Sequence, residues 1–119
     1  MESKIFNSEL KVLNILWKNG DVPAKQIVKA LKEEIDWSRS TTYTMIKRCI
    51  EKGLIENKGG DFICSALISK DEAQKFEIQS LINNMCDGSS DNLIAAMVRN
   101  ELVSKEELQN LKDMIISLA

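Results

Sequence analysis

The chain has 119 residues, of which 44% are hydrophobic and 29% charged, and a net charge of −2, which is typical of an ordered soluble protein of about one domain's length. It contains no histidine, which excludes imidazole catalysis and a Cys-His nucleophile. The cysteines lack zinc-site spacing and no glycine-rich phosphate loop occurs, so we expect neither an enzyme nor a bound metal or cofactor.

The first elements expected along the chain are two short helices. The stretch NSELKVLNILWKNG has apolar residues at helical spacing, with Asn7 or Ser8 as the N-cap and Gly20 at the end. Pro23 suits the first turn of a second helix, which ends near Asp36. The apolar face of this second helix consists of Ile27, Val28, Leu31 and Ile35.

A third helix follows, and its two faces differ in chemistry. We expect Ser38 as its N-cap and Gly53 as the residue that stops it after Lys52. The face expected to pack on the first two helices carries Thr42, Met45, Ile46, Cys49 and Ile50. The outer face carries Ser40, Thr41, Tyr43, Thr44, Lys47, Arg48 and Glu51.

The chemistry of this outer face suits the DNA major groove. Ser and Thr near the start of a recognition helix can hydrogen-bond to base edges, while Lys and Arg bind phosphates or guanine. A plainer interpretation is that the hydroxyl residues cap the helix, and that Lys47 and Arg48 belong to a solvated surface. The hydroxyl residues exceed what one cap needs, which favours DNA binding.

After Gly53 the pattern changes from helix to strand. In LIENKGGDFICSAL, apolar residues flank Gly59-Gly60, a dipeptide that can form a tight two-residue hairpin turn. Three helices followed by a two-stranded hairpin are the element order of the winged helix-turn-helix. We therefore predict a mainly α fold with a small β hairpin, in which the third helix enters the major groove.

The rest of the chain is expected to be helical. The segments SKDE (69–72) and SKEE (104–107) are capping boxes, which mark the starts of two helices. The first of these helices runs to Met85, a short one covers about 93–100, and the last runs from Glu106 to the C-terminus.

These C-terminal helices carry more apolar surface than so small a region can bury alone. We therefore expect residues 1–68 to be the winged-helix DNA-binding domain and residues 69–119 to be a helical dimerisation domain. The residues expected at the interface with a second copy are Leu81, Ile82, Met85, Leu93, Ile94, Met97, Val98, Leu108, Leu111, Ile115 and Leu118.

Positive charge is concentrated in the first half. Up to Cys64 the chain has eleven Lys and Arg against nine Asp and Glu, whereas the remainder has five against nine. This difference fits a DNA-binding front and an acidic assembly region. Since no signal peptide or membrane-spanning run is recognisable, we expect a cytoplasmic protein with no membrane insertion and with free thiols.

Three further residues invite a functional interpretation. Trp17 and Trp37 could stack on bases, but their positions at helix ends favour a role as core anchors. Cys86 is the one cysteine considered as a redox sensor, and without a neighbouring His or Cys we expect an ordinary thiol.

The stretch WSRSTTYTMIKRCIEKGLI resembles the recognition-helix signature of the penicillinase repressor family, the BlaI/MecI/CopY group. The matching residues are Trp37, Ser38, Thr41, Thr44, Met45, Ile46, Arg48, Lys52 and Gly53. SELKVLNILWKNGDVPAKQI is similar to the first two helices of the family, and CDGSSDNLIAAMV resembles its dimerisation region at Gly88 and Ser89. The resemblance therefore spans nearly the whole chain.

The resemblance implies a homodimeric transcriptional repressor that binds an inverted-repeat operator containing TACA and TGTA elements. Under this interpretation Thr41 and Thr44 read bases, and Lys58 of the wing touches the DNA backbone. The residues expected to bind phosphate or to flank the base contacts are Ser40, Tyr43, Lys47 and Arg48. Control of β-lactam-resistance genes, and relief of repression by a membrane sensor protease, rest on the resemblance alone.

The chain also departs from the family pattern. Gly60, Asp61 and Cys64 replace an arginine and aromatic residues usual in the wing, so weaker wing contacts are expected. The C-terminus lacks the cysteine-rich motif of copper-responsive members, so copper sensing is not expected. The bond cleaved in some members, between Asn and Phe, corresponds here to Ala96-Met97.

Two other functions fit parts of the pattern. The chain could be a winged-helix protein interaction module without DNA binding. It could also be a multidrug-type regulator with a ligand pocket, which only an apolar cavity would reveal. Steep salt dependence of duplex binding separates a repressor from an interaction module.

Overall fold

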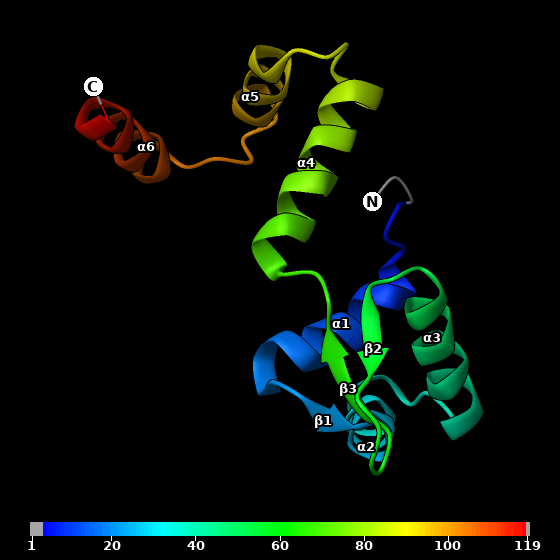
Figure 1. Ribbon diagram of the computed structural model, residues 1–119. Coiled ribbons are helices and arrows are strands. Elements are labelled where there is room, and N and C mark those ends of the chain that lie inside the picture. Colours follow the sequence, from blue (N-terminus) through cyan, green and yellow to red (C-terminus); the bar gives the residue numbers. More distant parts are fainter. Residues whose placement is uncertain (1–3, 119) are drawn as a thin grey trace. The chain divides into compact units, whose positions relative to one another are not determined.

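The computed structural model describes residues 4–118 (Figure 1). The contacts within the chain divide it into two compact units, of which one ends at Glu77 and the other begins at Ile78. Whether residues 1–68 fold as a domain of their own stays a prediction, because α4 (Lys70–Met85) begins within the first unit.

The first unit has the winged helix-turn-helix order that the sequence predicts, so the expected mainly α fold is confirmed (Figure 1). Before α4 it contains α1 (Asn7–Asn19), β1 (Val22–Pro23), α2 (Ala24–Ile35), α3 (Arg39–Glu51), β2 (Ile55–Asn57) and β3 (Ile63–Ala66). The strands form an antiparallel sheet in the order β1-β3-β2. Ile55 lies opposite Ala66 in this register, and Val22 lies opposite Cys64.

The third strand was not predicted. The sequence indicates a two-stranded wing, but the segment before α2 pairs with the free edge of β3. Pro23 has an extended backbone (φ −63°, ψ 147°) and is the N-cap of α2 rather than part of its first turn. Two residues are too short a run for alternation of polar and apolar side chains to reveal.

The start of α1 also differs from the prediction. Its N-cap is Phe6, and both residues proposed as caps, Asn7 and Ser8, lie inside the helix. The Glu9 carboxylate instead accepts a hydrogen bond from the Phe6 backbone N–H at 2.8 Å. A buried acid in the first turn thus satisfies the N-cap N–H, which is the glutamate half of a capping box without the hydroxyl half.

The predicted limits of α3 are confirmed. Ser38 is its N-cap, with its hydroxyl oxygen accepting from the Thr41 N–H at 3.2 Å. Gly53, just beyond the helix, has φ +76°, a conformation that costs glycine little. Asp36 adopts a left-handed conformation between α2 and α3, which turns the chain between these helices.

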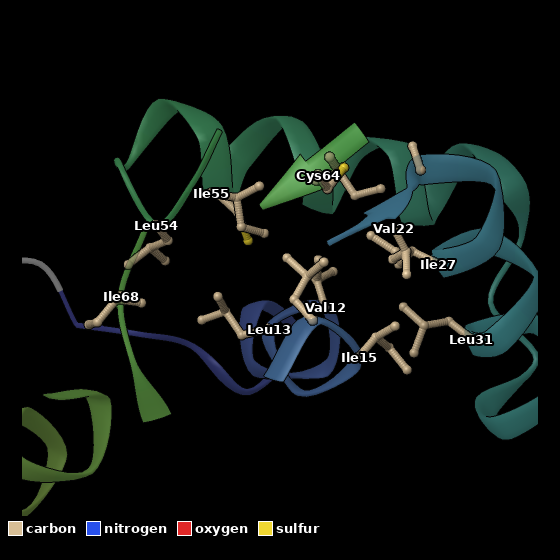
Figure 2. Packing of buried hydrophobic residues seen from close by; sticks show 14 of the residues in the cluster. Val12, Leu13, Ile15, Val22, Ile27, Leu31, Leu54, Ile55, Cys64 and Ile68 are labelled. Atoms are coloured by element: carbon tan, nitrogen blue, oxygen red, sulfur yellow. The ribbon is translucent and has the colours of Figure 1, made fainter. Parts of the chain in front are cut away.

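Buried side chains of α1, α2, α3 and the sheet meet in one core (Figure 2). Val12 and Leu13 of α1 lie at its centre, and Ile27 and Leu31 of α2 are fully buried beside them. The expected role of Trp17 and Trp37 as core anchors is confirmed, since both pack partly buried against this cluster. The Trp17 indole N–H donates to the Ile68 carbonyl at 2.9 Å, which fastens α1 to the chain that leaves the wing.

The second unit consists of the end of α4, α5 (Ser90–Arg99) and α6 (Lys105–Leu118).

Both predicted capping boxes, at the starts of α4 and α6, are present. The Ser69 hydroxyl accepts from the Glu72 N–H at 3.0 Å, and Ser104 and Glu107 repeat this bond at 3.0 Å. α5 begins earlier than expected because its first turn is polar, and a search for apolar spacing does not detect polar turns.

Among residues 4–118, no helix has both the length and the apolar character needed to cross a membrane. No group of three or more His, Cys, Asp or Glu side chains in this part of the chain is placed to hold a metal ion.

Candidate nucleic-acid interface

The position of α3 is set by its buried face. Thr42, Ile46 and Cys49 are fully buried against the core, and Met45 and Ile50 are half-buried beside them. This is the face that helical spacing predicts. The opposite face must therefore point to solvent (Figure 1).

The residues proposed to touch DNA lie on that outer face. Ser40, Thr41, Thr44, Lys47 and Arg48 are exposed, and Tyr43 is half-buried. They span almost the whole of α3, with hydroxyl residues in its first half and cations in its second. The structure thus brings six of the seven predicted site residues onto one helix face, while Lys58 lies between β2 and β3.

The two threonines have different free hydrogen-bonding groups. The Thr44 hydroxyl donates to the Ser40 carbonyl at 2.8 Å, which leaves its oxygen free to accept a bond on this exposed residue. The Thr41 hydroxyl oxygen accepts from the Ser38 hydroxyl at 2.9 Å, so its own proton remains available to donate. The pair can therefore present one donor and one acceptor to neighbouring base edges.

The cations of the face carry no ion pair. Within residues 4–118, neither Lys47 nor Arg48 lies within ion-pair distance of a carboxylate, so both charges are available to phosphate. Lys58 differs, because its Nζ lies 3.1 Å from Asp21 Oδ2. The Ser65 hydroxyl and then Lys58 lower the pKa of Asp21, so this partner stays ionised at neutral pH.

The wing turn is longer than the predicted two-residue hairpin. The Lys58 N–H donates to the Ile63 carbonyl at 2.8 Å, and the Ile63 N–H donates to the Gly59 carbonyl at 3.1 Å. The turn therefore comprises residues 59–62. Phe62 ends it with φ +60°, an unfavourable conformation for an aromatic residue.

Two contacts hold Phe62 in this conformation. Its carbonyl accepts from the Ala24 N–H at 2.9 Å, which caps the start of α2. Its ring meets the ring of Tyr43 edge to face, with centroids 6.0 Å apart. The Arg39 guanidinium lies over the ring of Tyr43, 5.2 Å from its centroid. Sequence reasoning missed Arg39 as a site residue, because no spacing rule relates the wing turn to the start of α3.

The cysteines of the first unit, Cys49 and Cys64, are buried rather than part of the outer face of α3. All three thiols are free and buried, as the sequence predicts for their oxidation state. Burial, reinforced by the nearby negative charge of Glu9, raises the pKa of Cys49 to about 12. Burial also raises the pKa of Cys64 to about 11, so neither thiol is a reactive thiolate at neutral pH.

Comparison with known proteins identifies the protein family of this chain. The family model described as penicillinase repressor matches residues 5–117, which is almost all of the chain. The chain belongs to the penicillinase repressor family.

Individual relatives agree with this assignment. The penicillinase repressor of Bacillus licheniformis is 25% identical, over 94% of this chain and 89% of its own length. The methicillin resistance regulatory protein MecI of Staphylococcus aureus (strain N315) is 26% identical, over 94% of this chain and 93% of its own length. A solution structure of monomeric Bacillus licheniformis BlaI in complex with the blaP half-operator is 27% identical. The superposition with this BlaI structure covers 60% of the present chain and 90% of the BlaI chain, with a TM-score of 0.52.

The family consists of transcriptional repressors, which are not enzymes. This chain is accordingly a DNA-binding transcriptional repressor with a winged-helix fold. Membership decides against the interaction module without DNA binding that the sequence left open.

Proposed function

We propose that this repressor binds an inverted-repeat operator in the cytoplasm as a homodimer, with α3 of each subunit in the major groove and the wing on the flanking backbone. The observation that carries the proposal is the outer face of α3. Its hydroxyl groups and unpaired cations are exposed together, while its other face is buried in the core.

Each side chain has a proposed role that follows from its free groups. Thr41 and Thr44 contact base edges, Thr41 as donor and Thr44 as acceptor and through its methyl group. Lys47 and Arg48 bind phosphates, since nothing among the described residues neutralises them. Ser40 and Tyr43 flank these contacts on the same face.

Lys58 is the weakest member of the proposed interface. Its ion pair with Asp21 must be exchanged for one with phosphate, and the glycine-rich turn beside it adds no second cation. We therefore expect a modest wing contribution.

The second unit supports the homodimer. No residue of α5 or α6 is buried in a single chain. α5 and α6 border an apolar groove of about 470 Å³, lined by Ile94, Leu108, Leu111, Lys112, Ile115 and Ile116. The exposed apolar side chains of these helices suit an interaction site, and a second copy would cover them.

The predicted interface residues fit this role. The exposed ones are Leu81, Met85, Ile94, Val98, Leu111, Ile115 and Leu118, and the half-buried ones are Ile82, Leu93, Met97 and Leu108. Pairing through them places two α3 helices on one duplex, with half-sites about 34 Å apart or a multiple of it.

Relief by a membrane sensor protease, and control of β-lactam-resistance genes, stay predictions from the family resemblance. The bond Ala96-Met97 lies inside α5, and both residues are half-buried. A protease binds extended backbone, so this helix would first have to unwind.

Duplex binding by alanine variants tests the proposal. The probe is a labelled duplex from the region upstream of the gene that encodes the repressor, with a scrambled duplex beside it. Thr44→Ala should weaken binding to the first duplex by about tenfold and leave the second unchanged, because a base contact is lost. Arg48→Ala should weaken both, with a salt slope flatter by about 0.9.

A variant of an exposed cation on α1, Lys11→Ala, is the matched control for net charge. Unchanged affinity in both α3 variants would remove this face from the DNA site.

A further inference from the structure

The first residue of α3, Arg39, lies against an aromatic ring of the same helix. Its guanidinium lies 5.2 Å from the centroid of the Tyr43 ring and takes part in no ion pair within residues 4–118. A cation in the first helical turn faces the positive end of the helix dipole, which disfavours it. Within residues 4–118, the ring of Tyr43 one turn further along is therefore the contact that holds this arginine.

The surroundings of Arg39 do suit an anion. No acidic residue occupies the first turn of α3, so nothing there competes with a bound phosphate. The contact with Tyr43 restricts the long side chain, and the guanidinium makes no hydrogen bond to residues 4–118, so its donors there are available to a ligand. An arginine ordered before binding loses less entropy when it meets its ligand.

We propose that Arg39 binds a backbone phosphate of the operator, from a position that the Tyr43 ring fixes. The inference deepens the proposed function and rests on it, because it assumes that DNA lies along the outer face of α3. Tyr43 is then a positioning residue whose ring, rather than its hydroxyl group, carries this effect.

A residue of the wing turn, Phe62, holds the Tyr43 ring in place. The Phe62 ring packs edge to face on Tyr43, with 6.0 Å between centroids. Phe62 is itself fixed by the bond between its carbonyl and the Ala24 N–H. The contacts among Arg39, Tyr43 and Phe62 therefore join the start of the recognition helix to the wing turn. We expect that a substitution of Phe62 alters the position of Arg39 through the Tyr43 ring.

The test is a set of mutant cycles in the full-length repressor, read by anisotropy of the upstream and scrambled duplexes across a salt series. Arg39→Ala is made in the wild-type, Tyr43→Phe and Tyr43→Leu backgrounds. In the first two we expect it to weaken both duplexes by a similar factor, roughly fivefold to tenfold, and to flatten the salt slope by about 0.9. In the Tyr43→Leu background, which lacks the ring, its effect should fall below about twofold.

Two variants extend the design. Phe62→Leu should also reduce the effect of Arg39→Ala, and thermal melting checks that each protein is folded. Lys11→Ala again serves as the control for lost charge.

Each result has a definite meaning. No loss of affinity and no change in slope for Arg39→Ala would overturn the phosphate contact. An equal loss in the Tyr43→Leu background would overturn the positioning role of the ring. If Thr44→Ala and Arg48→Ala weaken binding while Arg39→Ala does not, this inference alone fails. If all three are silent, the proposed α3 interface itself fails.

Discussion

Glu9 at the start of α1 and Lys52 at the end of α3 form a buried ion pair, with 2.7 Å between Lys52 Nζ and Glu9 Oε1. The Glu9 side chain is fully buried, and that of Lys52 is 17% exposed. The same ammonium group donates to the Lys4 carbonyl and lies 5.0 Å from the centre of the Phe6 ring. One lysine thus ties the recognition helix to the segment that begins the fold.

Loss of Lys52 and loss of Glu9 should lower the free energy of unfolding by different amounts. Lys52→Met leaves a carboxylate buried without its partner and should lower the free energy of unfolding by roughly 3 kcal/mol. Glu9→Gln keeps an acceptor for the Phe6 N–H and leaves a lysine that can reach water, so the loss should be smaller. Urea denaturation followed by fluorescence of Trp17 and Trp37, both in the first unit, measures this.

The double variant Glu9→Gln, Lys52→Met should recover most of the stability lost in Lys52→Met. The exposed pair Lys32–Asp36 provides a control, because Lys32→Met should leave the unfolding curve unchanged. Equal and small effects at Glu9 and Lys52 would show that the carboxylate is solvated rather than buried.

The bond from the Trp17 indole to the Ile68 carbonyl should be measurable as stability. Trp17→Phe keeps an aromatic ring but loses the donor, which should cost about 1 kcal/mol from the hydrogen bond. Trp37→Phe is the matched control, since the Trp37 indole makes no hydrogen bond to residues 4–118. Equal losses in the two variants would assign the effect to ring size alone.

The capping boxes should make the C-terminal helices sensitive to acid. Hydrogen bonds from Ser69 lower the pKa of Glu72 below 4.5, and those from Ser104 do the same for Glu107. Because the pKa is lowered in the folded state, the stabilisation is present above pH 4.5 and is lost as the pH falls through the lowered value.

An NMR titration of the glutamate carboxyl carbons measures both groups. In Ser69→Ala the pKa of Glu72 should move part of the way toward 4.5, because the side-chain hydrogen bond is lost while the larger contribution, from the backbone N–H of residue 69, remains, and the pKa of Glu107 should stay where it was. A Glu72 that titrates at its ordinary value in the unmodified protein would contradict the box.

A charge in the apolar groove of α6 should break the proposed dimer. Leu111 and Ile115 are 45% and 66% exposed in the single chain, so replacing either by Glu leaves the helix itself unstrained. Sedimentation should show a dimer for the unmodified repressor and a monomer for Ile115→Glu. Binding to the upstream duplex should then weaken strongly, because two linked half-site contacts become one.

Gln109→Glu is the control for this substitution, since Gln109 is an exposed residue outside the groove. A dimer that survives both Leu111→Glu and Ile115→Glu would place the interface elsewhere.

Much of the fold could be read from local signals in the sequence. Ser38, Gly53 and the capping boxes at Ser69 and Ser104 mark helix ends by chemistry that acts within a few residues. The faces of α3 follow from the helical period in the same way. These features lie where the prediction placed them.

The errors at the sheet, the wing turn and Arg39 share a physical cause, which is dependence on residues distant in sequence. Strand β1 exists because β3 offers an edge, and the turn at 59–62 is shaped by Tyr43 and Ala24 as much as by its own glycines. Arg39 becomes a candidate only when the ring beneath it is seen. Glu9 is polar, and only its lysine partner explains why it is buried.

The most direct test of the central claim is an amide chemical-shift titration of the full-length repressor with its upstream duplex. We predict that the largest changes fall in residues 38–48 and in the wing turn at 59–62, and that the exposed side of α1 around Lys11 changes little. Changes confined to α1 or α6, with α3 undisturbed at saturation, would contradict the claim that the outer face of α3 binds DNA.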